Sequence, residues 1–192
     1  MPDVRPRFAS PAWRVRAGVL AAMTLGVAAV FAPGLLRAVA PQALAAPTAP
    51  RLAYNASASI PGGFYLITAQ PPRVGDVILT RLPAAVAQLA AARHYLPAGV
   101  PLIKPIAAGY GDHVCVRDGI VRINGRGVAR TLAADRLGRP LAAWPGCRLL
   151  GPDEWFLLGV GRPDSFDSRY FGPIPRTAAF GRAVPLWVWG AP

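Results

Sequence analysis

The chain has 192 residues, which is enough for one domain with its own hydrophobic core and some accessory segments. Its formal net charge is +12, but the basic residues are scattered and form no runs interleaved with aromatic residues. A nucleic-acid-binding surface usually shows such clusters, so we do not expect a nucleic-acid partner. The 21 basic residues comprise 20 arginines and a single lysine, Lys104.

The first 50 residues divide into three segments of different composition. Residues 1–16 carry four arginines and one aspartate, residues 17–36 carry no charge, and residues 37–50 form a linker rich in Ala and Pro. Twenty uncharged residues are enough for a helix to cross a bilayer, and positive charge before the span orients the N-terminus towards the cytoplasm. The sequence therefore predicts a cytoplasmic N-terminus, a transmembrane signal anchor in the inner membrane, and a periplasmic domain over residues 51–192. A signal peptide cleaved near the small residues at 43–47, which would release a periplasmic form, is the alternative.

The exported part consists of short runs of β-branched and aromatic residues, which Gly, Pro and Asp separate. This pattern is typical of strands, and we predict strands over residues 63–69, 76–82, 101–107, 113–125 and 154–160. A hairpin turn is expected at Arg117-Asp118-Gly119. Residues 83–96 are rich in Ala and begin with a proline, which favours a helix. The expected fold is a mainly antiparallel β domain with one notable helix, behind the N-terminal anchor.

Cys115 and Cys147 are the two cysteines of the chain. An even number of cysteines in an oxidising compartment favours a disulfide between them, and two buried free thiols are the alternative. The only histidines, His94 and His113, do not lie at ligand spacing, so we expect no zinc site and no other metal or cofactor.

Lys104 lies among apolar residues in the predicted strand 101–107. Apolar burial lowers the pKa of a lysine, and only a neutral amine can act as a general base. Arginine cannot take that role because it stays protonated, which would explain one lysine among twenty arginines. The alternative is an ordinary surface lysine on one side of a strand.

Serines are scarce, and four of the five fall into two pairs, Ser57 with Ser59 and Ser165 with Ser168. Hydroxyls of this kind commonly cap backbone groups in turns. Considered alone, the two pairs are therefore explained by turn structure.

Three motifs in order nevertheless resemble the membrane-bound signal peptidases that use a Ser-Lys dyad. They are a serine before proline at Ser59-Ile60-Pro61, a lysine eight residues before Asp112, and "SFDSRYFG" at 165–172. The stretches "NASASIPGGFY", "GRPLAAWPGC" and "SFDSRYFGPI" are most similar to the TraF-type peptidases of plasmid conjugation systems. The resemblance extends from about residue 55 to residue 175, essentially the whole exported domain.

The resemblance implies that Ser59 is the nucleophile and Lys104 its general base. It also implies that Ser57 helps to form the oxyanion hole, together with the backbone N–H of the nucleophile. Typical leader peptidases place two residues between nucleophile and proline, whereas one residue separates Ser59 from Pro61 here. Ser57 is therefore the alternative nucleophile.

In the last motif, the resemblance implies that Ser165 orients the lysine amine and that Asp167 pairs with Arg169. The implied function is maturation of the pilin precursor of a conjugative pilus, an activity that in some systems is linked to joining the pilin ends into a circle. The expected partners are the pilin precursor, the inner membrane and other components of the conjugation apparatus. A general type I signal peptidase and a non-enzymatic periplasmic component of a secretion channel are the alternatives.

Overall fold

The structure, a computed structural model, describes residues 51–159 and 161–190. The predicted cytoplasmic segment, signal anchor and linker lie outside these residues. Within the described ranges, no helix combines the length and hydropathy needed to span a membrane.

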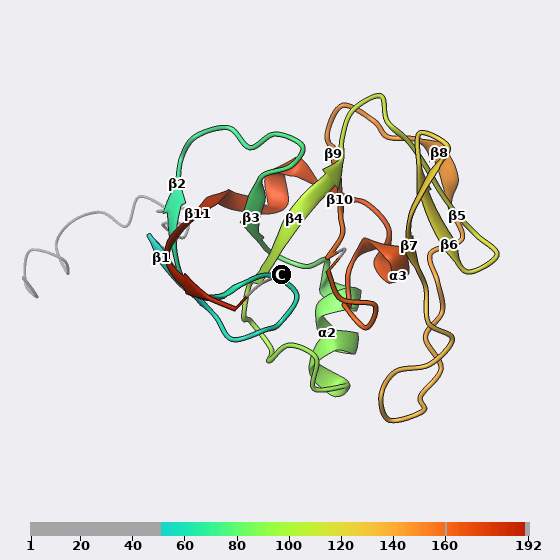
Figure 1. Ribbon diagram of the computed structural model, residues 1–192, viewed down its shortest axis with the longest axis horizontal. Coiled ribbons are helices and arrows are strands. Elements are labelled where there is room, and N and C mark those ends of the chain that lie inside the picture. Colours follow the sequence, from blue (N-terminus) through green and yellow to red (C-terminus); the bar gives the residue numbers. More distant parts are fainter. Residues whose placement is uncertain (1–50, 160, 191–192) are drawn as a thin grey trace, which may run out of the picture. The chain divides into compact units, whose positions relative to one another are not determined.

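The described residues form two antiparallel sheets and few helices (Figure 1). The larger sheet has seven strands, in the order β1 (Leu52–Asn55), β2 (Gly62–Thr68), β11 (Ala179–Trp189), β3 (Val77–Thr80), β4 (Leu102–Ala108), β9 (Glu154–Leu157) and β10 (Ile174–Pro175). The smaller sheet has four, in the order β7 (Arg126–Arg130), β6 (Ile120–Ile123), β5 (His113–Arg117) and β8 (Cys147–Leu149). The prediction of a mainly antiparallel β domain is confirmed for this part of the chain.

The helices are short. α2 (Ala84–Ala92) begins after Pro83 and is the notable helix expected from the sequence. It ends four residues earlier than predicted. His94, just past its end, has a φ of 58°, a left-handed backbone conformation that does not occur within a right-handed α-helix. α3 (Ser168–Phe171) and the 3₁₀ helix η1 (Arg176–Ala178) were not predicted.

The segment 113–125, which was predicted to contain a hairpin turn, forms the hairpin of β5 and β6. Asp118 and Gly119 have φ values of 53° and 72°, and the residues on either side, Arg117 and Ile120, pair directly. Two residues with positive φ define the tight turn that matches the twist of the two strands, so the expected turn is confirmed.

The long strand β11 was missed because it contains residues that normally interrupt strands. Its ladder with β3 shifts between Ala179 and Gly181, and its ladder with β2 shifts between Pro185 and Trp187. At Gly181, a Cβ atom would overlap the carbonyl oxygen of Thr68 in β2, so only glycine allows the two backbones to approach. Irregularities of this kind are bulges, which bend a strand without ending it.

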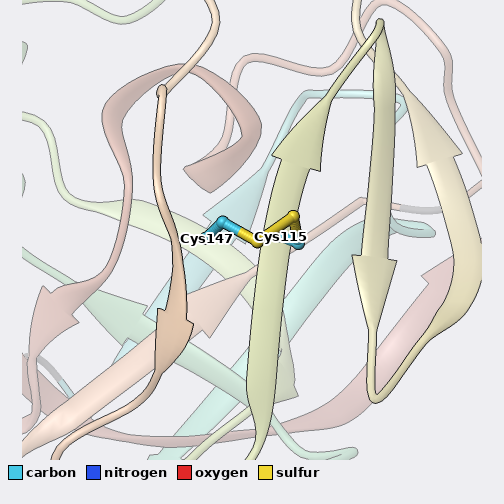
Figure 2. The surroundings of a disulfide bond; sticks show 2 residues. All are labelled: Cys115 and Cys147. Atoms are coloured by element: carbon cyan, nitrogen blue, oxygen red, sulfur yellow. A yellow bond between two sulfur atoms is a disulfide. The ribbon is translucent and has the colours of Figure 1, made fainter.

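The disulfide between Cys115 and Cys147 joins two strands of the smaller sheet (Figure 2). The two cysteines lie directly opposite each other in β5 and β8, with a sequence separation of 32 residues. The expected pairing is therefore present. In the chain-entropy model, closing a loop of this length stabilises the fold by roughly 3 to 4 kcal/mol.

Candidate active site

The loop between β1 and β2 holds the two serines of the first motif. β1 ends at Asn55, and the chain returns antiparallel to it from Gly62. The hydroxyl oxygens of Ser57 and Ser59 lie 2.9 Å apart, and Ser59 has only 9% of its surface exposed. The loop therefore presents two neighbouring hydroxyls, of which that of Ser59 is buried and that of Ser57 is exposed.

Hydrophobic packing holds this loop against β4. Ile60, the residue after Ser59, and Ile103, the residue before Lys104, belong to the same buried cluster. Protein interiors are close-packed and resist displacement of their members. This packing consequently fixes the serine loop and the lysine strand relative to each other.

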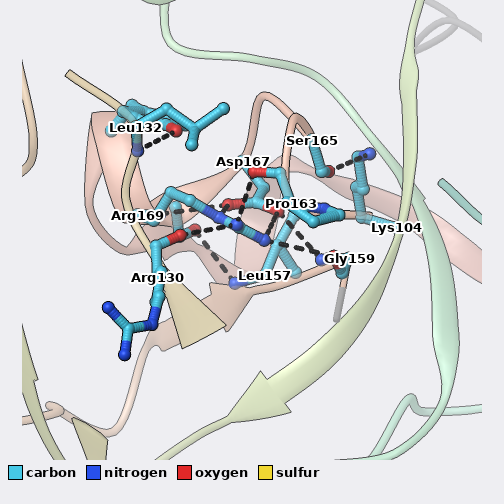
Figure 3. A network of polar contacts seen from close by, with 11 residues as sticks. Lys104, Arg130, Leu132, Leu157, Gly159, Pro163, Ser165, Asp167 and Arg169 are labelled. Carbon is cyan, nitrogen blue, oxygen red and sulfur yellow. Dashed lines mark hydrogen bonds and ion pairs between the residues drawn. The ribbon is translucent and has the colours of Figure 1, made fainter. Parts of the chain in front are cut away.

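Lys104 is buried, with 4% of its surface exposed. Its amine donates a hydrogen bond to the hydroxyl oxygen of Ser165 at 2.8 Å (Figure 3). Burial has the largest effect on this amine, and it lowers the pKa of Lys104 to about 8. Among the nearby charges, those of Asp167 and Asp164 raise this pKa and that of Arg169 lowers it.

The surroundings of Gly159 show that Ser59 and Ser165 border the same small space. A Cβ atom on Gly159 would lie 2.7 Å from the Ser165 hydroxyl oxygen and 3.4 Å from the Cβ of Ser59. The hydrogen bond from Lys104 to Ser165 brings the amine to this space as well. A side chain at Gly159 would displace the serine that holds the lysine, so the site requires glycine here.

Ser59 and Lys104 are not joined by a direct hydrogen bond in the described part of the chain. Ser59 is bonded to Ser57, and Lys104 is bonded to Ser165. Catalytic hydrogen bonds often tighten only when substrate binds. The two groups are thus neighbours across a shared space, and their catalytic roles stay predictions.

Asp167 and Arg169 form a buried ion pair beside the lysine (Figure 3). Two guanidinium nitrogens bind the two carboxylate oxygens, Nε to Oδ1 at 2.7 Å and Nη2 to Oδ2 at 3.0 Å. The exposed fraction is 0% for Asp167 and 1% for Arg169. Buried charges are tolerated only when they are paired and fully hydrogen-bonded, and this geometry meets the first condition.

The remaining hydrogen bonds of the pair connect three segments. Arg169 donates to the carbonyl oxygens of Arg130 at the end of β7, of Pro163, and of Gly159 beyond β9. Asp167 accepts from the backbone N–H of Gly159 at 2.9 Å and from that of Arg169, which caps α3. The ion pair therefore locks the backbone around the space that Ser59 and Ser165 share.

The three buried charged groups do not balance when the lysine is protonated. Asp167 and Arg169 neutralise each other, so a protonated Lys104 leaves an excess positive charge in a buried site. A neutral amine removes it. The carboxylates of Asp167 and Asp164 raise the pKa of Lys104, so it is burial of the amine that lowers this pKa to about 8. The lowered pKa favours an amine that is ready to accept a proton near neutral pH.

Sequence reasoning missed two residues of this site. Asn55, which is 3% exposed, makes hydrogen bonds across the serine loop, and Gly159 provides the space between the serines. A single amide before a turn and a single glycine after a strand have no spacing that marks them. The hydroxyl of Ser168, the second serine of the later pair, accepts a hydrogen bond from the backbone N–H of Leu157 and so links α3 to β9.

Together these groups have the chemistry needed for acyl transfer. A hydroxyl lies near an amine whose pKa is close to neutral, as nucleophilic catalysis by serine requires. The described residues contain no group of three or more His, Cys, Asp or Glu that could hold a metal ion.

Comparison with known proteins places the chain in a family. The model of the family "Signal peptidase, peptidase S26" matches residues 21–189. The plasmid transfer protein TraF of Escherichia coli is 33% identical over 145 residues, which cover 70% of this chain and 82% of that protein. The conjugal transfer protein TraF of Agrobacterium fabrum is 33% identical over 146 residues, which cover 70% and 81% of the two chains. A solved signal peptidase I from Enterococcus faecalis V583 matches 60% of this chain and 98% of its own, with 21% identity and a TM-score of 0.35.

The chain therefore belongs to the signal peptidase family, peptidase S26. Within this family of peptidases it is of the TraF type, as the similarity over most of the length of both TraF proteins shows. The family resemblance seen in the three sequence motifs is confirmed.

Proposed function

We propose that this protein is a serine endopeptidase that uses Ser59 and Lys104 as a catalytic dyad. Neutral Lys104 takes the hydroxyl proton of Ser59 while the hydroxyl oxygen attacks the carbonyl carbon of the scissile peptide bond. The backbone N–H of Ser59 and the hydroxyl of Ser57 then donate to the oxyanion. As the C–N bond breaks, Lys104 returns the proton to the leaving amine, and a serine ester remains.

Release of the product requires a second nucleophile. Water attacks the ester, with Lys104 again accepting a proton, and a free carboxylate leaves. If the amine of the same substrate attacks instead, the product is a ring with one water less than the linear peptide. Ser165 holds the lysine amine at the site throughout, which is supported by its 2.8 Å hydrogen bond.

The proposed substrate is the pilin precursor of a plasmid conjugation system. The names of the two TraF relatives, which refer to plasmid and conjugal transfer, support this substrate class. Anchoring an enzyme in the membrane that also holds its substrate raises their effective concentration, and residues 17–36 are the proposed anchor. Other components of the conjugation apparatus are the proposed partners.

The proposed topology places residues 1–16 in the cytoplasm and residues 51–192 in the periplasm. A reporter fused after residue 50 is expected to be active when it requires the periplasm and inactive when it requires the cytoplasm, because the arginines precede the span. Cytoplasmic activity of that fusion would contradict both the anchor and its orientation.

The observation that carries the proposal is the buried Lys104 amine, with its pKa of about 8, beside two serine hydroxyls. Purified full-length protein is expected to cleave the pilin precursor, and kcat/KM should rise with pH up to about 8 and then level off, because only the neutral amine is a base. Activity that falls across this range would contradict a lysine base. Cleavage of many unrelated exported precursors with equal efficiency would indicate a general type I signal peptidase.

A further inference from the structure

The side chain of Asn55 lies at the centre of the serine loop. Its oxygen accepts from the backbone N–H of Ser57 at 3.0 Å and from the Ser57 hydroxyl at 2.9 Å. Its nitrogen donates to the carbonyl oxygens of Ser57, Ile60 and Pro61, at 2.9, 3.2 and 3.0 Å. The residues on both sides of Ser59 are therefore attached to one buried amide.

The chemistry of the partners fixes the orientation of this amide. The three carbonyl oxygens require a donor, and the Ser57 N–H requires an acceptor. Exchanging the nitrogen and oxygen of Asn55 would make four of these five contacts unsatisfied or repulsive, and only the Ser57 hydroxyl, which can accept as well as donate, would keep its hydrogen bond. Asn55 Oδ1 is consequently a fixed acceptor for the Ser57 hydroxyl.

This fixed acceptor determines which serine donates to the other. A hydroxyl has one proton, and Ser57 gives its proton to Asn55. The 2.9 Å contact between the two hydroxyls must therefore use the proton of Ser59. In this substrate-free state Ser59 donates to Ser57, and Ser57 donates to Asn55. For the proposed reaction the Ser59 proton turns to Lys104 and the Ser57 proton turns to the oxyanion.

We infer that Asn55 is a positioning residue for Ser59, acting through Ser57 and through the loop carbonyls. It fixes the position of the nucleophile oxygen through the Ser57 hydroxyl. It also fixes the backbone of Ser59, because Ser57 before it and Ile60 after it are both bonded to the Asn55 amide. This inference rests on the proposed function, because it assigns Ser59 as the nucleophile. The alternative is that Asn55 contributes only to the stability of the loop.

The test compares kcat and KM for cleavage of the pilin precursor by full-length Asn55→Ala, Asn55→Asp and wild-type protein. Asn55→Ala removes all five contacts, and kcat should fall about 10²-fold, as expected for a misplaced reacting group. KM should change much less, because the substrate contacts are intact. Thermal unfolding measured in parallel ensures that the rates refer to folded protein.

Asn55→Asp provides a readout that a purely structural role would not move. When protonated, the introduced carboxyl has an acceptor oxygen and an O–H donor, and it can replace the amide in part. When ionised, it faces three carbonyl oxygens without a proton to donate. The ratio of variant to wild-type kcat should therefore rise as the pH falls from about 9 to about 6. Protonation of Lys104 cannot cause such a rise, because it lowers kcat of both proteins as the pH falls, and a new carboxylate nearby would only raise the pKa of Lys104 in the variant. Tyr65 also bonds to the loop, because its hydroxyl donates to the carbonyl oxygen of Pro61. Burial raises the pKa of Tyr65 above its usual value, so this side chain does not titrate between pH 6 and pH 9.

The chain offers a matched control in its other asparagine, Asn124, whose side chain also bonds to a backbone N–H and a polar group at a turn. Asn124→Ala is expected to lower stability and leave kcat unchanged. A folded Asn55→Ala protein with wild-type kcat would overturn the inference, and so would Asn55→Asp with a pH-independent ratio. If wild-type protein cleaves no precursor, the proposed function fails. The inference is then decided by the rate at which a small phosphonylating serine probe labels Ser59, which should follow the same pattern.

Discussion

Replacing Lys104 with arginine is expected to reduce cleavage of the pilin precursor by about 10⁴-fold or more. Arginine keeps the positive charge and most of the side-chain stem, but its guanidinium stays protonated over the whole working range. It can therefore donate to Ser165 and still fail to accept a proton from Ser59. The measurement is the single-turnover cleavage rate of purified full-length variants, with circular dichroism as the folding control.

Ser59→Ala should be equally inactive, and combining it with Lys104→Arg should cause little further loss. Residues that act as a unit in catalysis give strongly non-additive effects. Ser57→Ala should retain measurable activity if its hydroxyl only stabilises the oxyanion. Near-normal turnover by folded Lys104→Arg protein would rule out the dyad, and loss in Ser57→Ala beside an active Ser59→Ala would move the nucleophile to Ser57.

The parts of the fold that were predictable have local causes. The strands around Lys104 consist of apolar and β-branched residues, and the turn at Asp118-Gly119 needs two residues that tolerate positive φ. β11 could not be predicted in this way, because a strand that contains Gly181 and Pro185 is stabilised by pairing with β2 and β3, far away in the sequence. Short strands such as β8 likewise depend on partners that no local pattern identifies.

The residues of the site likewise fall into those that the sequence suggested and those that only the structure shows. A single lysine among arginines, flanked by apolar residues, suggested a buried amine with a lowered pKa but left a surface lysine as the alternative. The family resemblance favoured the first, and the structure shows that Lys104 is buried and that its pKa is lowered. The positions of Ser57, Ser165 and Asp167 were expected from the family resemblance. Asn55 and Gly159 act through geometry alone, one by bonding to both sides of a loop and the other by leaving space. Such roles become visible only when distant segments are brought together.

The two buried cations of the site are expected to affect stability in opposite directions when each is replaced by methionine. Arg169 is bidentate with Asp167, so Arg169→Met leaves a buried carboxylate without its partner and should lower the free energy of unfolding by about 3 to 5 kcal/mol.

Lys104 has only the Ser165 hydroxyl as its hydrogen-bond partner in the described structure. Lowering its pKa from 10.5 to about 8 means that folding disfavours the charged amine by about 3 kcal/mol, so Lys104→Met should raise the free energy of unfolding by about that amount at pH 7 while abolishing activity.

The pH dependence provides the decisive check of this last prediction. Between the folded pKa of about 8 and the unfolded value of 10.5, the unfolded chain binds more protons at Lys104 than the folded chain does. The free energy of unfolding of the wild-type protein should therefore rise with pH through this range. The advantage of Lys104→Met, complete below about pH 8, should shrink and disappear near the unfolded pKa. Denaturant titrations of the full-length proteins in detergent at pH 7 and about pH 10 measure this difference. A Lys104→Met protein less stable than wild type at pH 7, or an advantage that does not shrink with pH, would show that the buried amine does not carry the predicted energetic cost.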